Sequence, residues 1–321
     1  MEKKIREKLA AWFHLQGRDL PWRRTTDPYA ILVSEFMLQQ TTVAAVIPYF
    51  GRWMKAFPDV AALAAAEEPQ VLAHWQGLGY YSRARNLQRA ARAVMEFHAG
   101  RVPASFEALR SLPGVGDYTA GAVAAFAFDA AVPVIDANIA RVLARLHDWR
   151  HPIDDAAGRA FLVDAARALL PETGGRLHTS ALMELGALVC VSRNPRCLEC
   201  PVRAECRATR PEEIPVKRAR KETEHVTEFR AFLRSGKKIW LKFSEGPRWK
   251  GLWLLPEAEK PTRPPDHVEV YPITRYRVTM NVFAERGSRP GLEAFPPGRL
   301  PPMPSPHRRA VEAMLAKETP H

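Results

Sequence analysis

Apolar residues recur at intervals of three and four positions along the first part of the chain, up to about residue 206. Ala-rich runs such as Val60–Ala66 strengthen this pattern, which is that of amphipathic helices. The spacing therefore predicts an all-α module over residues 1–206.

From Val226 onward the apolar period changes to two. Alternate residues from 229 to 233 are apolar, Ser235–Gly236 suits a hairpin turn, and residues 238–243 predict the returning strand. Residues 276–282 alternate in the same way and predict a longer strand.

The end of the chain changes pattern twice. Residues 290–306 contain seven prolines and are expected to lack regular structure, whereas 305–315 predict a closing helix. Residues 226–321 are therefore expected to form a small α+β domain. The polar stretch 207–225, with its basic run 217–221, predicts an exposed linker between the two domains.

Length and charge agree with this division. A chain of 321 residues with 46% hydrophobic residues can fill two cores, and no stretch is apolar enough to cross a membrane. Residues 1–206 carry 24 Lys and Arg against 21 Asp and Glu, and residues 207–321 carry 23 against 14, so the second part holds +9 of the net +12. Such a basic excess favours a polyanionic partner, with nucleic acid as the first candidate.

All four cysteines of the chain fall in one short stretch, Cys190, Cys197, Cys200 and Cys206. A chain otherwise free of cysteine, which opens without an apolar leader, is expected to be cytoplasmic with thiols that bind metal. Four unequally spaced thiolates in one run favour a single [4Fe-4S] cluster, with zinc as the alternative.

A Pro-Gly-Val-Gly turn joins two apolar helical runs in Leu109–Val123. Glycines at such a turn let backbone amides approach a phosphate, and the next helix adds the positive end of its dipole. The segment predicts a helix-hairpin-helix DNA contact, for which a plain helix connector is the alternative.

Two carboxylates stand out in apolar surroundings. Asp136 precedes an apolar helical stripe and predicts an N-cap, a position in which a rigid, ionised carboxylate could also stabilise a nearby cation. Glu35 shares a helix face with Ile31 and Leu38, where it is either a structural ion pair or a buried acid that retains its proton near neutral pH.

Five motifs in this order closely resemble those of MutY-type adenine DNA glycosylases, which belong to the helix-hairpin-helix base-excision superfamily. They are Ser34–Thr41, Trp75–Asn86, Leu112–Gly116, Val134–Asn138 and the spaced cysteines, and they cover residues 18–206 almost without interruption. Trp249–Pro256 is similar to the Trp-centred motif of the family's Nudix-like second domain, although this likeness is weaker.

The resemblance implies a mainly α glycosylase domain with a cluster loop, followed by a small α+β Nudix-like domain. It also implies a hydrolase that removes a mispaired adenine, opposite 8-oxoguanine or guanine, from double-stranded DNA and acts as a monomer. Glu35 would protonate the departing base, Asp136 would stabilise the sugar cation, and Asn138 and Tyr118 would position them. DNA or base contacts are implied for Gln40, Tyr80, Leu112, Gly114, Gly116, Glu184, Thr274 and Arg275.

Two positions modify this expectation. Relatives that also cut the strand have a lysine where this chain has Tyr118, so efficient lyase activity is not expected. The family's lesion-recognition loop is typically Phe-Ser-His or Phe-Thr-His, whereas this chain has Ile273–Thr274–Arg275. A charged guanidinium favours guanine or phosphate, so a shifted lesion preference is a second hypothesis.

Three other functions were compared with this one. A thymine- or uracil-mismatch glycosylase of the same superfamily remains an alternative, although residues 37–41 and 77–82 are closer to the adenine branch. A non-catalytic damage-binding protein is disfavoured because both Glu35 and Asp136 are present. The second domain has no Gly-x5-Glu-x7-Arg-Glu-x2-Glu-Glu run, which argues against a Nudix hydrolase.

Overall fold

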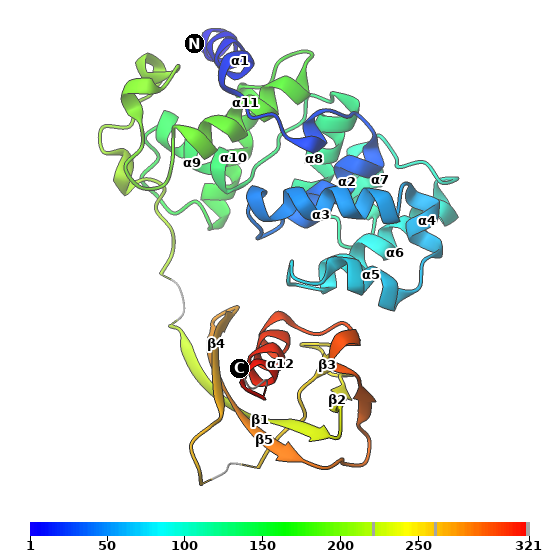
Figure 1. Cartoon of the computed structure of the whole chain (residues 1–321). Coiled ribbons are helices and arrows are strands. Elements are labelled where there is room, and N and C mark those ends of the chain that lie inside the picture. The colour runs from blue at the N-terminus through cyan, green and yellow to red at the C-terminus, as the bar shows by residue number, and fades with distance from the viewer. Residues whose placement is uncertain (220–221, 260–261, 319–321) are drawn as a thin grey trace. The chain divides into compact units, whose positions relative to one another are not determined.

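The computed structural model describes residues 1–219, 222–259 and 262–318, and Figure 1 labels its elements. These residues form two compact units, one of residues 1–65 and 86–219 and the other of residues 66–85, 222–259 and 262–318. Arg220 and Lys221, part of the predicted basic run, lie outside the described residues. None of the helices in the described ranges is both long and apolar enough to span a membrane.

The first 219 residues are helical, as the three- and four-residue spacing predicts. The α-helices are α1 (Glu2–Gln16), α2 (Pro28–Leu38), α3 (Val43–Ala56), α4 (Val60–Ala65), α5 (Glu68–Trp75), α6 (Ser82–Phe97), α7 (Phe106–Ser111), α8 (Asp117–Phe128), α9 (Ala137–Leu146), α10 (Ala156–Ala168) and α11 (Gly175–Leu188). Short 3-10 turns are η1 (Pro21–Arg23), η2 (Cys197–Glu199), η3 (Arg203–Glu205) and η4 (Pro211–Glu213).

Helix α2 is buried on nearly all sides. Asp27 caps it by accepting hydrogen bonds from the amides of Tyr29 and Ala30, and Pro28 supplies the fixed first φ angle. Nine of its eleven residues are buried, because it packs against both α3 and α8. A helix that is apolar all round belongs inside a domain, so any charged side chain on it is held in a dry environment.

A second helical core lies between α1, α9, α10 and α11. Its buried residues include Leu9 of α1, Leu143 of α9, Leu162 of α10 and Leu185 of α11. Three of the four cysteines, Cys190, Cys200 and Cys206, pack at its edge. The cysteine loop is therefore anchored on α9 and α11.

The final part of the chain is a mixed sheet with one helix. The strands are β1 (Glu224–Ser235), β2 (Lys238–Phe243), β3 (Trp253–Leu254), β4 (His267–Ile273), β5 (Tyr276–Arg286) and β6 (Glu293–Phe295), and the helix is α12 (Ser305–Glu318). The order is β3-β2-β1-β5-β4, with β6 paired to β2. The long strands β1 and β5 run parallel at its centre (Figure 1), and the other pairs are antiparallel.

The alternating pattern correctly predicts the hairpin strands, the strand from Tyr276 and the closing helix. Two details differ from the predictions. The Pro-rich stretch 290–306 includes β6 and a 3-10 turn, η5 (Pro297–Arg299), because β2 offers a free edge to residues 293–295. The stretch expected to be an exposed linker includes Ile214, which is only 1% exposed and packs into the helical core.

Candidate active site

Glu35 is a buried acid on α2. The residue is only 3% exposed, and its Oε2 accepts a hydrogen bond of 2.8 Å from the hydroxyl of Tyr118 on α8. Burial raises the pKa of Glu35 to about 7, while the Tyr118 bond and the Arg23 charge lower it and the Asp136 charge raises it. The carboxyl group can therefore hold a proton near neutral pH.

Asp136 is the N-cap of α9, as its position before the apolar stripe predicts. Its Oδ1 accepts a bond of 2.6 Å from the amide of Ile139, and Oδ2 accepts one of 2.9 Å from Nδ2 of Asn138. Burial raises the pKa of Asp136 above its usual value, and these two bonds offset part of that effect. The two amide donors thus favour the ionised form, as expected, but they lower the pKa by less than burial raises it.

Both carboxylates line one cavity of about 210 Å³. Tyr118 and Asn138, which bond to them, also line it. The helical pairs α2 with α8 and α9 with α11 bring these residues together from distant parts of the sequence. Two carboxylates with separate hydrogen-bond partners in one cavity can take different protonation states.

Glu184 lines the same cavity from α11, but both its oxygens are already engaged. Arg18 donates to it from the backbone amide, Nε and NH2 at 2.7–2.9 Å, and Arg23 donates from NH2 at 2.9 Å. Burial opposes the charged form, yet these bonds hold the pKa of Glu184 at about 2. Glu184 therefore holds Arg18 and Arg23 in the cavity wall. The sequence predicted a base contact for Glu184 but not this role.

A chain of hydrogen bonds leads from Asp136 to the cysteine loop. Asn138 donates to Asp136, and its Oδ1 accepts a bond of 2.9 Å from NH2 of Arg141. Nε of Arg141 donates to the carbonyl oxygen of Cys190 at 2.7 Å, and its NH2 donates to that of Gly186. These bonds connect Asp136, a candidate catalytic residue, to Cys190, the first cysteine of the loop.

The predicted hairpin joins α7 and α8. Gly114 has φ +76°, and a Cβ atom there would lie 2.5 Å from Cβ of Asn86, so this position requires glycine. A Cβ at Gly116, the N-cap of α8, would meet nothing within 4 Å, which leaves the backbone open to an approaching phosphate. Leu112 is 3% exposed, and its carbonyl oxygen accepts a hydrogen bond from the amide of Val115 within the turn.

Two residues expected to enter the duplex lie in exposed, left-handed turns. Gln40, between α2 and α3, is exposed with φ 57°. Tyr80 has φ 47° and is 45% exposed, so it is not an ordinary core residue. Non-glycine residues in this conformation are uncommon and often mark functional turns.

The expected lesion loop is the turn between β4 and β5. Thr274 is exposed with φ 51°, and its hydroxyl donates to the carbonyl oxygen of Ile273. Arg275 pairs with Glu224 at 3.0 Å and donates to the hydroxyl of Tyr276 at 2.9 Å. The guanidinium is therefore held against the sheet.

The four cysteines follow α11 in a loop that contains η2 and η3. Cys197 begins η2, and Cys200 and Cys206 directly follow η2 and η3. Burial raises the pKa of Cys200 to about 11, the backbone hydrogen bond from Val202 lowers it, and the charges of the other three thiols raise it further. Among the described residues, no three His, Cys, Asp or Glu side chains form a group suited to a single metal ion.

The sequence-based prediction missed the arginines of the cavity. The cavity is lined in part by Arg18, Leu20, Trp22, Arg23, Arg176 and Ser180. Basic residues around Trp22, just before α2, were the available signal, since such mixtures are typical of nucleic-acid contacts. The sequence-based prediction also missed the contacts of Arg141 and Arg145. Their position one turn apart on a largely buried helix was the available signal.

Comparison with known proteins agrees with this geometry. The model of the HhH-GPD superfamily base excision DNA repair proteins matches residues 33–161. Adenine DNA glycosylase from Rattus norvegicus is 44% identical over 64% of this chain and 41% of its own, so the chain spans about two fifths of that relative. The Mycolicibacterium smegmatis enzyme is 44% identical over 62% and 68%, and that of Buchnera aphidicola from Acyrthosiphon pisum is 32% identical over 77% and 72%.

Solved structures agree with the fold of the helical part. A thermostable thymine-DNA glycosylase superposes with a TM-score of 0.60 and 29% identity, over 64% of this chain and 95% of that chain. Endonuclease III in a trapped DNA complex gives a TM-score of 0.55 at 23% identity, over 66% and 97%, and shares the fold. With the curated relatives, this places the chain in the MutY-type adenine DNA glycosylase family of the HhH-GPD superfamily.

Proposed function

We propose that the protein is a monofunctional DNA glycosylase that removes adenine mispaired with 8-oxoguanine or guanine. The observation that carries this proposal is the pairing of Glu35, whose pKa is about 7, with Asp136 in one cavity. Breaking an N-glycosidic bond through a cationic sugar requires an acid for the departing base and a negative charge for the sugar. These two residues supply both.

The chemistry assigns each group one task. Glu35 donates its proton to N7 of the flipped adenine as the bond between C1′ and N9 breaks. Asp136 stabilises the positive charge that develops on the sugar. A water molecule then gives its hydroxyl to C1′ and its proton to Glu35, which leaves adenine and an abasic site. Extrusion of the base costs a few kcal/mol and is easiest at a mispair.

Tyr118 supports hydrolysis without strand cleavage. A lyase needs an amine that attacks C1′ to form a Schiff base. The Tyr118 hydroxyl instead donates to Glu35, so it has no such role. Borohydride should therefore trap little covalent enzyme–DNA complex.

DNA binding is assigned to exposed backbone and turn residues. Gly116 is exposed with open space beside its Cα atom, which suits the approach of a phosphate. Gln40 and Tyr80 lie in exposed turns with positive φ, which suits insertion into a duplex. We propose that the protein acts on double-stranded DNA as a monomer.

The four thiolates are assigned to a single [4Fe-4S] cluster. Soft thiolate ligands suit such a cluster, and the four sulfurs belong to one anchored loop. The cluster would supply a rigid centre for this loop rather than a reactive group. Arg193, Arg196 and Arg203 on the same loop could then contact phosphates.

The loop between β4 and β5 carries the second candidate, a shifted lesion preference. Arg275 is bonded to Glu224 and Tyr276, which limits its reach toward a base and favours a phosphate contact. If Arg275 reads the opposite base, Arg275→Ala should change the ratio of excision rates opposite 8-oxoguanine and guanine. If it contacts phosphate, both rates should fall together.

A panel of duplexes tests the leaving base. Single-turnover excision would be measured for A, 2-hydroxyadenine, hypoxanthine, T and U, each opposite G and 8-oxoguanine, with alkali cleavage as readout. We expect the highest rate for a purine, with adenine released. Release of T or U without adenine would instead favour a mismatch glycosylase like the thymine-DNA glycosylase that shares this fold.

A further inference from the structure

Arg145 is one of the most buried charged residues of the protein. It lies on α9 and is 2% exposed. Its guanidinium donates to the carbonyl oxygens of Val191 at 2.7 Å, Ser192 at 3.1 Å and Cys190 at 3.3 Å. A further bond of 2.9 Å reaches the carbonyl oxygen of Ile214, on the far side of the cysteine motif.

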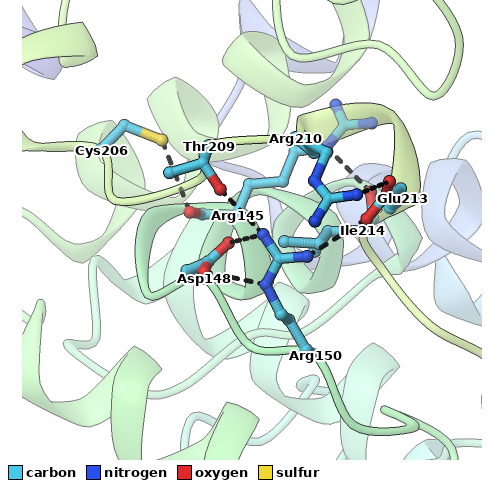
Figure 2. Close-up of polar contacts among 8 residues, drawn as sticks. All are labelled: Arg145, Asp148, Arg150, Cys206, Thr209, Arg210, Glu213 and Ile214. Carbon is cyan, nitrogen blue, oxygen red and sulfur yellow. Dashed lines mark hydrogen bonds and ion pairs between the residues drawn. The ribbon is translucent and has the colours of Figure 1, made fainter.

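The same residue contacts the first and last cysteines. NH1 of Arg145 lies 3.4 Å from Sγ of Cys190. Sγ of Cys206 lies 3.5 Å from the carbonyl oxygen of Arg145, as Figure 2 shows. Arg145 thus contacts both the first and the last cysteine of the loop, through its side chain and its own carbonyl oxygen.

Within the described part of the chain, the guanidinium of Arg145 has no carboxylate partner. Its hydrogen bonds in the described ranges go to carbonyl oxygens and to one sulfur, and it forms no ion pair with Asp or Glu there. A buried cation without an anion costs several kcal/mol. The thiol of Cys190, whose Sγ lies 3.4 Å from NH1, is a neighbouring group that can become anionic.

We infer that Arg145 is a positioning residue for the cluster, which holds the cysteine loop and supplies the counter-charge to the metal-bound thiolate of Cys190. This inference rests on the proposed [4Fe-4S] cluster. Groups that hydrogen-bond to metal ligands commonly change metal affinity by about 10–100-fold when removed. Arg145 should therefore govern how well the cluster is retained.

Arg150 offers a matched control close by. Its guanidinium donates to Asp148 at 3.0 Å, Thr209 at 2.9 Å and Glu213 at 3.2 Å. Figure 2 draws these contacts as dashed lines. Arg150 therefore also connects the end of α9 to the segment after Cys206. It is more exposed and contacts no cysteine among the described residues.

The experiment compares Arg145→Met, Arg145→Lys and Arg150→Met in the full-length holoenzyme. Iron and acid-labile sulfide per chain, visible absorbance and the rate of iron loss to a chelator would be measured. We expect Arg145→Met to lose iron at least about tenfold faster than wild type. Arg145→Lys keeps the charge but not the fork of donors, so its rate should lie between these two, and Arg150→Met should match wild type.

Hydrogen exchange separates loop positioning from general unfolding. In the Arg145 variants, amides of residues 190–214 should exchange faster while those of α2 and α8 do not. Normal iron retention and normal loop exchange in Arg145→Lys and Arg145→Met would overturn the inference. If wild type contains no iron and sulfide, the cluster assignment itself fails, which is a distinguishable result.

Discussion

The hydroxyl of Tyr118 donates a hydrogen bond of 2.8 Å to Oε2 of Glu35, although 83 residues separate them. The bond joins the hairpin helix α8 to the buried helix α2. It lowers the pKa of Glu35 relative to burial alone, and the balance of the two leaves that pKa at about 7. The hairpin that joins α7 and α8 thus also adjusts the pKa of Glu35.

Tyr118→Phe should move the pH profile of excision. Loss of the bond removes an influence that lowers the pKa of Glu35, so the protonated acid should persist to higher pH. Single-turnover rates from pH 5 to 9 should show an alkaline limb near 7 in wild type and above it in the variant. An unshifted limb would mean that another group sets the profile.

Asp136→Asn should abolish excision without unfolding the helix that it caps. Asparagine caps helices as well as aspartate does, but it cannot stabilise a cation by charge. We expect the single-turnover rate to fall by about 10³-fold or more, with lesion binding retained.

The control is Asp155, the N-cap of α10, which has nearly the same φ and ψ as Asp136 and accepts from Gly158 at 2.7 Å. Asp155→Asn should excise at the wild-type rate. If both variants lose activity equally, the effect is structural.

Glu35→Gln should increase stability at high pH. A raised pKa means that the folded state binds more protons than the unfolded state between pH 4.5 and about 7, so stability falls as pH rises through this window. Above pH 7 the neutral amide should gain up to about 3 kcal/mol in unfolding free energy, from the pKa difference at about 1.4 kcal/mol per unit.

Urea unfolding of wild type and Glu35→Gln at pH 4.5 and pH 8 measures this effect. The two proteins should differ little at the lower pH and most at the higher. A variant that is less stable than wild type at pH 8 would contradict a neutral, desolvated Glu35.

The two hairpin glycines should respond differently to alanine. Gly114→Ala forces a side chain into a left-handed residue and into contact with Asn86, which should cost about 2 kcal/mol or more. Gly116→Ala meets open space, so its stability should change by less than about 0.5 kcal/mol, while its added methyl group should weaken DNA binding. Thermal unfolding and binding titrations at fixed salt separate these effects.

Local sequence patterns predicted the features that depend on neighbours in the chain. The apolar stripe after Asp136 places a helix there, and its cap follows from the side chain itself. Period-two alternation likewise predicted β1, β2 and β5, because it is a pattern of neighbouring residues in the chain. The prediction that the Pro-rich stretch lacks regular structure was wrong at β6, because β6 forms by pairing with the free edge of β2.

Local sequence patterns could not predict contacts between residues that are far apart in the chain. The sequence predicted a base contact for Glu184, but it gave no sign of its bonds to Arg18 and Arg23, more than 160 positions away. Arg145 resembles a surface residue by type, yet its partners at residues 190–192 and 214 bury it. Such partners follow from how α1, α9 and α11 pack, which local periodicity does not specify.

The most direct measurement is a single-turnover reaction of the full-length protein with a duplex containing adenine opposite 8-oxoguanine or guanine, divided into samples with and without alkali. We predict free adenine in both samples and strand cleavage only after alkali, with Glu35→Gln slowed by about 10²-fold or more. Absence of adenine release, or strand cleavage without alkali at the rate of base loss, would contradict this prediction.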